Sequence, residues 1–87
     1  MTDDRKPKRL TPHAFKMEAV LERGRNQWHT RLEIARAMGK KRLTPYDIDL
    51  LDLLAEMGRI RVQQTEGYSR EGYRWEYGIF DANYVES

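Results

Sequence analysis

The sequence predicts an α+β domain in which three short helices precede a two-stranded β-hairpin. Apolar residues recur at helical spacing between residues 12 and 57, whereas after residue 58 they alternate with polar residues at the two-residue period of a strand. The chain has 87 residues, which is enough for one domain with a modest core. We therefore expect a flexible basic arm over residues 1–10, a folded domain over 11–80 and an acidic tail over 81–87.

The first helix is expected over residues 12–23. Thr11 can cap its start by accepting a backbone hydrogen bond, and Pro12 suits the first helical position, where an N–H would have no partner. Gly24 is a natural end, because glycine commonly terminates helices. Residues 26–29 then form a short connector that could make one bridge of extended chain.

The second helix is expected over residues 31–38. Thr30 and Glu33 have the spacing of a capping box, in which each side chain bonds the backbone N–H of the other residue. Gly39 should end this helix. Its inward face is expected to consist of Leu32, Ile34, Ala35 and Met38.

The third helix is expected over residues 45–57, because Thr44, Pro45 and Asp47 repeat the start signal. Its predicted inward stripe is Ile48, Leu51, Leu54 and Ala55. This stripe would leave Leu50 and Leu53 on the outer side among acidic residues. The alternative is a helix that is buried more broadly than usual.

Two strands are expected over residues 59–63 and 73–79, joined by a glycine-containing loop. Leu43 is expected to reach the core from the turn before the third helix. Trp28, Tyr73, Trp75 and Tyr77 are also expected in the core, with a base-stacking platform as the alternative. The side chains predicted to be largely buried are Leu21, Leu32, Ala35, Met38, Ile48, Leu51, Leu54, Ile60, Val62, Trp75 and Tyr77.

Composition argues against several classes of function. The chain has no cysteine, which excludes disulfides and zinc–thiolate sites, and its apolar runs are too short for a membrane span. His13 and His29 lack partners at metal-ligand spacing and are expected at the surface or as caps. With no phosphate-binding glycine loop or paired carboxylates, we expect a non-enzyme without metal, cofactor or small-molecule substrate. We expect it in the cytoplasm, associated with the nucleoid if it binds DNA.

Two segments resemble the winged helix-turn-helix family. Residues 30–39 (TRLEIARAMG) are similar to its second helix, and residues 54–62 (LAEMGRIRV) to its junction between third helix and wing. The resemblance covers about residues 11–80 and does not identify a subfamily. It implies duplex DNA binding, with the third helix in the major groove and the hairpin on the backbone, as in a transcription regulator.

The third helix departs from that pattern, because it has four acidic residues and no Lys or Arg between Thr44 and Met57. Carboxylates repel phosphates, so no base-reading role is assigned to residues 46–53. Positive charge instead gathers in residues 1–43, whose balance is +7, against −5 in residues 44–87. The candidate nucleic-acid contacts lie in the arm (Arg5, Lys6, Lys8, Arg9), the second helix (Arg31, Arg36), the following turn (Lys40, Lys41, Arg42) and the hairpin (Arg61, Arg70, Arg74).

Alternatives remain open for these groups. The arm could be a disordered tail, the turn a solvated loop, and Arg61 or Arg74 an ordinary partner of Glu76. The phosphate-binding hypothesis for the turn depends on its place beside the start of the third helix. A different function is a protein-interaction module or homodimer that uses the third helix as its contact face. The residues proposed for that contact are Asp49, Leu50, Asp52 and Leu53.

Overall fold

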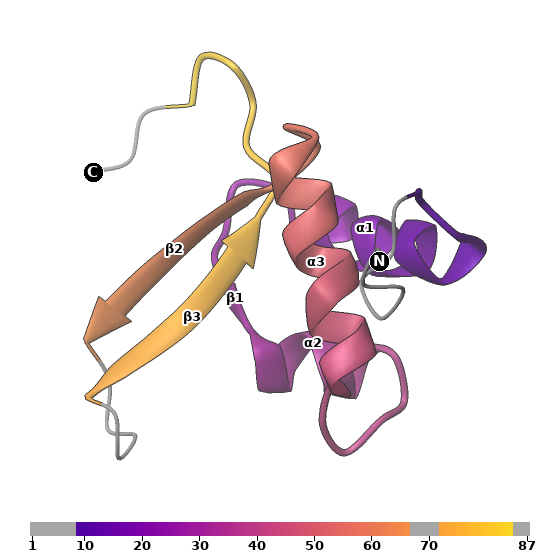
Figure 1. The fold of residues 1–87 in the computed structure, drawn as a ribbon. Coiled ribbons are helices and arrows are strands. Elements are labelled where there is room, and N and C mark those ends of the chain that lie inside the picture. The colour runs from indigo at the N-terminus through magenta and orange to yellow at the C-terminus, as the bar shows by residue number, and fades with distance from the viewer. Residues whose placement is uncertain (1–8, 67–71, 85–87) are drawn as a thin grey trace, which may run out of the picture.

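The computed structural model describes residues 9–66 and 72–84. Its elements are the helices α1 (Pro12–Arg23), α2 (Arg31–Ala37) and α3 (Pro45–Glu56) and the strands β1 (His29–Thr30), β2 (Arg61–Glu66) and β3 (Tyr73–Gly78). The strands form an antiparallel sheet in the order β1-β3-β2, and the β2–β3 hairpin projects from the helices (Figure 1). The predicted α+β class is confirmed. The prediction of a two-stranded sheet is wrong, because the connector before α2 pairs with β3.

Three threonines begin the three helices, as predicted. The hydroxyl of Thr11 accepts from the N–H of Ala14, and those of Thr30 and Thr44 accept from the third residue of α2 and α3. In α2 and α3 the side chain of that third residue, Glu33 or Asp47, accepts in turn from the backbone N–H of the threonine. Both predicted starts therefore form complete capping boxes, which satisfy N–H groups that would otherwise be orphaned.

The inward stripe of α3 shares Leu51 and Leu54 with the predicted stripe and also includes Asp47 and Leu50. These four residues are buried, at the spacing of one helical face. The side chain of Leu50 is 0% exposed, which confirms the alternative of a helix that is buried more broadly than usual. The stripe begins with an aspartate, which a search for apolar residues alone does not find.

The inward stripe of α2 also begins with a charged residue. Ile34 and Ala35 are buried, and Met38 is half-buried against the core. Arg31 stands at the first position of this stripe and is half-buried. The predicted burial of Leu32 is wrong, because the side chain lies off the stripe and is 48% exposed.

The sheet packs on the helices through β1 and β3. Tyr77 is buried as predicted, and Trp75 packs against the core on the same face of β3. The predicted burial of Val62 is wrong: it lies opposite Tyr77 but remains 39% exposed, because β2 is the sheet edge away from the helices. The side chain of Tyr73 lies outside the described part of the structure.

Helices and sheet share one core, which includes Leu43 as expected. Of the side chains predicted to be buried, Ile48 is half-buried and packs against this core. None of the helices in the described ranges is long and apolar enough to cross a membrane. The buried apolar residues are Ala14, Met17, Leu21, Ile34, Ala35, Leu43, Leu50, Leu51, Leu54, Ile60, Tyr77 and Ile79.

The chain after β3 is held against the loop that follows α1. The N–H of Asn26 donates to the carbonyl of Ile79 at 2.8 Å, and its side chain both accepts from and donates to Asp81 at 2.9 Å. Asn26 has φ of +67°, a conformation that asparagine tolerates better than most residues. Gly78 permits the close approach, because a Cβ there would lie 2.6 Å from the carbonyl oxygen of Gln27. This contact places the connector, residues 26–29, alongside β3. It explains why β1 forms as a third strand of the sheet.

Two leucines on α3 test the corrected stripe. Leu50→Ala should lower the free energy of unfolding by about 2–5 kcal/mol, because it opens a cavity in the core. Leu53→Ala removes a half-buried side chain and should cost about 1 kcal/mol. Urea denaturation followed by circular dichroism measures both, and equal losses would contradict the stripe described here.

Candidate nucleic-acid interface

One buried carboxylate organises the region where the candidate basic residues meet. Asp47, in the first turn of α3, is 1% exposed. Its Oδ2 accepts from the N–H of Thr44 at 2.8 Å and pairs with the ammonium group of Lys40. Its Oδ1 lies 2.6 Å from Nε2 of His13 on α1. The carboxylate thus joins α1, the α2–α3 loop and the start of α3.

The charge of Asp47 is balanced inside the protein. Burial by itself would raise the pKa of this carboxyl, but hydrogen bonds from Lys40, Thr44 and His13 outweigh burial and hold the pKa well below its ordinary value. The start of α3 therefore already holds an anion, and Lys40 is already paired. The expectation that this helix start would favour a phosphate beside Lys40 is wrong for that reason.

The two histidines have different roles. The side chain of His13 is 35% exposed and so lies at the surface as expected, but its bond to Asp47 was not predicted. His29 Nε2 lies 2.9 Å from the carbonyl oxygen of Gly24, which is the C-cap residue of α1, as expected of a capping histidine. Among the described residues, no group of three or more His, Asp or Glu could hold a metal ion.

Arg31 is engaged in packing. Its Nε donates to the phenol oxygen of Tyr77 at 3.0 Å, and its guanidinium lies 5.7 Å from the ring centre of Trp75. Burial raises the pKa of the Tyr77 phenol, and the hydrogen bond from Arg31 opposes that shift. Arg31 therefore links the start of α2 to β3. It would have to give up these contacts to bind a phosphate.

The described arginines of the hairpin also have partners. Arg61 lies over the rings of Trp28 and Phe80, 5.9 Å and 5.4 Å from their centres. Arg74 lies 3.5 Å from Glu76, the partner that the sequence suggested, but the two residues lie on the same strand and do not form the expected cross-strand pair. Both side chains are exposed and could contact a polyanion only in addition to these interactions.

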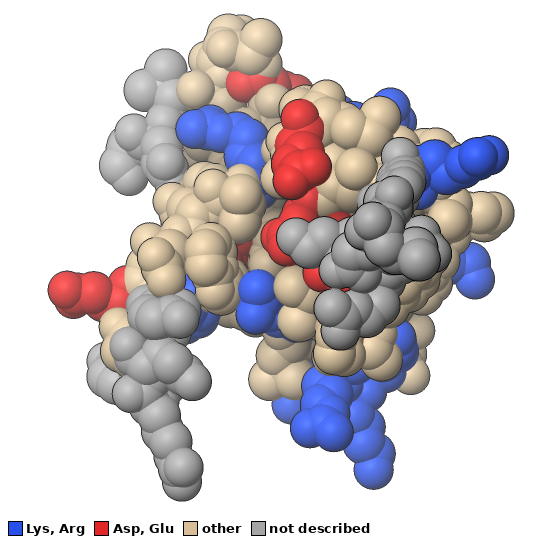
Figure 2. All heavy atoms as spheres, in the orientation of Figure 1, with Lys and Arg blue, Asp and Glu red and all other residues tan. Residues whose placement is uncertain are grey.

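Three candidate cations that are close in the chain are exposed and have neither an ion pair nor a ring contact within the described ranges: Arg36 on α2 and Lys41 and Arg42 in the loop after it. Figure 2 shows Lys and Arg side chains gathered below α3, where this loop lies. We call these three residues the loop cations. Arg9, just before α1, is exposed as well. The other candidates, Arg5, Lys6, Lys8 and Arg70, lie outside the described residues.

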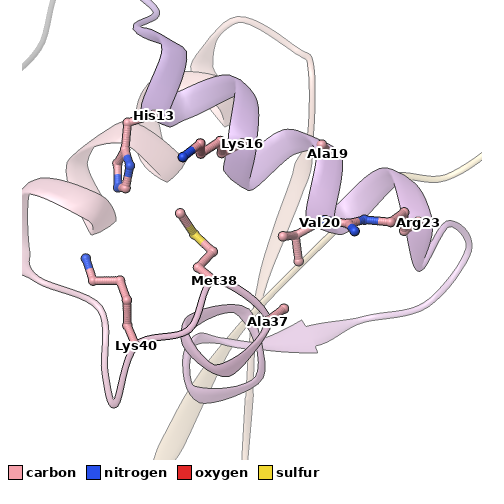
Figure 3. A pocket seen from close by; sticks show the side chains of 8 residues that line it. All are labelled: His13, Lys16, Ala19, Val20, Arg23, Ala37, Met38 and Lys40. Carbon is pink, nitrogen blue, oxygen red and sulfur yellow. The ribbon is translucent and has the colours of Figure 1, made fainter.

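Two cations on α1 were not predicted as site residues. Lys16 and Arg23 are exposed and lack an ion-pair partner among the residues described. They line a hollow between α1 and the end of α2, together with His13 and Lys40 (Figure 3). Their spacing of seven residues places them on one helix face and is the sequence signal that could have found them.

The outer face of α3 is acidic. Asp52 and Glu56 are exposed and Asp49 is half-exposed, at positions i, i+3 and i+7. Figure 2 shows acidic side chains along this helix. Because Leu50 is buried and Leu53 half-buried, the expected mixed stripe of acids and exposed leucines is reduced to the acids and part of Leu53.

Scans of the chain against protein-family models, curated proteins and solved structures found no match. Function therefore has to be argued from the sequence and the geometry above. That geometry separates the loop cations from an acidic α3. Among the other described candidates, contacts within the protein hold Arg31, Lys40, Arg61 and Arg74.

The pH dependence of stability tests the role of Asp47. Because its folded pKa lies below the unfolded value, its contribution is present above that unfolded value, 3.8, and is lost as the pH falls toward the folded pKa. Asp47→Asn should lower the free energy of unfolding by about 3 kcal/mol at pH 7 and by less at pH 3. Urea denaturation at both pH values measures the difference.

Asp49→Asn is the matched control, since it makes the same chemical change two residues away on a half-exposed side chain. It should change stability by less than about 0.5 kcal/mol at pH 7. If Asp47→Asn instead lowered the free energy of unfolding by the same amount at pH 7 and at pH 3, the carboxylate would not be held as described.

Proposed function

We propose that this chain is a winged-helix domain that binds duplex nucleic acid through its phosphate backbone, without base reading by α3. The order of helices followed by a hairpin is the order that the sequence resemblance implies. The additional short strand β1 lies between α1 and α2 and leaves that order intact. Because fold does not determine function, the proposal rests on the distribution of charge.

The observation that carries the proposal is that Arg36, Lys41 and Arg42 are exposed without ion pairs in the described part of the chain. A cation that already pairs with a carboxylate must give up that contact to reach a phosphate. An unpaired cation meets no such opposition and releases the counterions condensed on the duplex. These loop cations occupy one short stretch at the end of α2, which suits contact with consecutive phosphates.

Two other described arginines, Arg25 and Arg59, are less suited to this contact. Arg59 makes two bonds of 3.0 Å to the carboxylate of Glu18, and Arg25 bonds both Glu22 and Asp81. These exposed pairs are individually weak, so they do not exclude a phosphate. They do offset positive charge that would otherwise attract one.

The acidic face of α3 supports backbone binding over groove reading. A helix that carries Asp49, Asp52 and Glu56 outward would bring three carboxylates between two rows of phosphates. Salt screens such repulsion but does not change its sign. The duplex is therefore expected to run over the loop cations and to leave the outer face of α3 uncovered.

A second candidate function is contact with a basic protein surface through α3. The outward acids are accompanied by the half-buried Leu53 and by Met57, which is 54% exposed just after the helix. This combination of charge and exposed apolar surface favours a protein partner. Burial of Leu50 removes half of the apolar contact that the sequence suggested, so this function ranks second.

The salt dependence of duplex binding tests the first proposal. Changing the three loop cations together to glutamine should weaken binding to duplexes of unrelated sequence by similar factors. It should also reduce the slope of log K against log salt by about 2.7, because each lost phosphate contact contributes about 0.9. Fluorescence anisotropy with a labelled 20-base-pair duplex measures both quantities.

The matched control replaces Arg25, Arg59 and Arg74 with glutamine, which removes the same net charge from cations that have ion-pair partners. It should alter the slope by much less than the variant of the loop cations. Equal effects of the two triple variants would mean that overall charge, and not the loop, determines binding. Absence of duplex binding by the parent chain at low salt would overturn the proposal.

Replacement of acids on α3 tests the absence of base reading. Asp49→Asn combined with Asp52→Asn should leave non-specific duplex binding unchanged or strengthen it, because two repulsive charges are removed. The same anisotropy titration measures this change, with circular dichroism as the check of folding. Loss of sequence-specific binding in a folded variant would show that an α3 carboxylate accepts from a cytosine amino group.

A further inference from the structure

The hollow between α1 and the end of α2 is lined by two chemically different kinds of side chain, with cations at its ends and apolar groups between them. It has a volume of about 370 Å³, within the range of small-molecule sites. Lys16, Arg23, His13 and Lys40 contribute its basic groups. In Figure 3 the side chains of His13, Lys16 and Lys40 extend into the space around Met38.

The hollow has no carboxylate among its lining residues. Asp47, which bonds His13 and Lys40, is 1% exposed and carries one negative charge that Lys40 already balances. The acids of α1 are also engaged elsewhere, since Glu18 bonds Arg59 and Glu22 bonds Arg25. The positive charge of Lys16 and Arg23 is therefore uncompensated by any lining group.

The middle of the hollow is apolar. Ala19 and Val20 of α1 face Ala37 and Met38 at the end of α2. The thioether of Met38 is flexible and polarizable, so it can adapt to a flat or a branched apolar group. A bare inorganic anion would leave this wall exposed to water, whereas a neutral apolar molecule would leave the cations without a partner.

We propose that this hollow binds a small organic anion with an apolar body, of the class of an aromatic carboxylate. The carboxylate lies against Lys16 near His13, the ring covers Val20 and Met38, and Arg23 at the far end of the hollow adds to its positive charge. Charge-assisted hydrogen bonds orient the anion, and burial of the apolar wall adds affinity. The inference does not depend on nucleic-acid binding, because it uses none of the loop cations.

The site is tested by titrating the full chain with naphthalene-2-carboxylate, using isothermal calorimetry and amide chemical shifts. We expect saturable binding with a Kd below about 1 mM. The neutral isostere naphthalene-2-carboxamide should bind at least about tenfold more weakly, because it lacks the charge. The largest shifts should fall on residues of the hollow, such as Val20 and Met38.

Variants of the chain separate this site from general attraction to a basic protein. Lys16→Met combined with Arg23→Met should weaken the binding of naphthalene-2-carboxylate about tenfold or more. Lys41→Met with Arg42→Met removes the same charge outside the hollow and should change its Kd less than about twofold. Ala19→Leu, which fills the apolar middle from an exposed helix position, should also weaken binding while the fold is retained.

Three results would overturn the proposal. The first is no saturable binding of naphthalene-2-carboxylate up to about 10 mM. The second is equal binding of the acid and the amide, which would leave the cations without a role. The third is an unchanged Kd in the Lys16 and Arg23 double variant, together with chemical-shift changes that fall outside the hollow. Duplex binding is measured separately, so failure here leaves the proposed function untouched, and the reverse also holds.

Discussion

The packing of the three helices depends on the buried carboxylate of Asp47. Removal of a carboxylate from water costs several kcal/mol unless donors replace the solvent. Here the donors come from α1, from the α2–α3 loop and from the cap of α3 itself. In this arrangement His13, Lys40 and Thr44 meet at the same two oxygen atoms. The contact therefore specifies where α1 and the loop lie relative to α3, beyond what a non-directional apolar core can specify.

The same contact determines which cations the protein presents to a partner. Lys40 turns inward to Asp47, whereas Lys41 and Arg42 follow on the exposed side. Other described arginines pair with acids or lie over aromatic rings, as Arg59 and Arg61 do, and α3 carries its remaining acids outward. A nearly neutral chain thus acquires a local basic surface and a separate acidic one. This separation is the basis for proposing backbone binding at the loop and for excluding α3 from base reading.

Local sequence signals predicted the helix starts well, because each capping threonine bonds a residue only three positions away. They placed most inward residues of α2 and α3 correctly, but they included Leu32 and left out the charged residues with which both faces begin. The partners of those residues are distant: His13 is 34 residues from Asp47, and Tyr77 is 46 residues from Arg31. A charged residue three and four positions before two buried apolar residues can therefore belong to the core face, but only the tertiary fold reveals its partner. The basic hollow was missed for a related reason, since it joins α1 to the chain after α2.

The most direct measurement of the proposed charge arrangement is amide chemical-shift mapping of the full chain with an unlabelled duplex at low salt. We expect the largest changes at the end of α2 and in the following loop, centred on Arg36, Lys41 and Arg42. The outer face of α3 should change little, because its carboxylates keep phosphates away. The largest changes at Asp49, Asp52 and Leu53, with a silent loop, would contradict the account and place α3 in the groove.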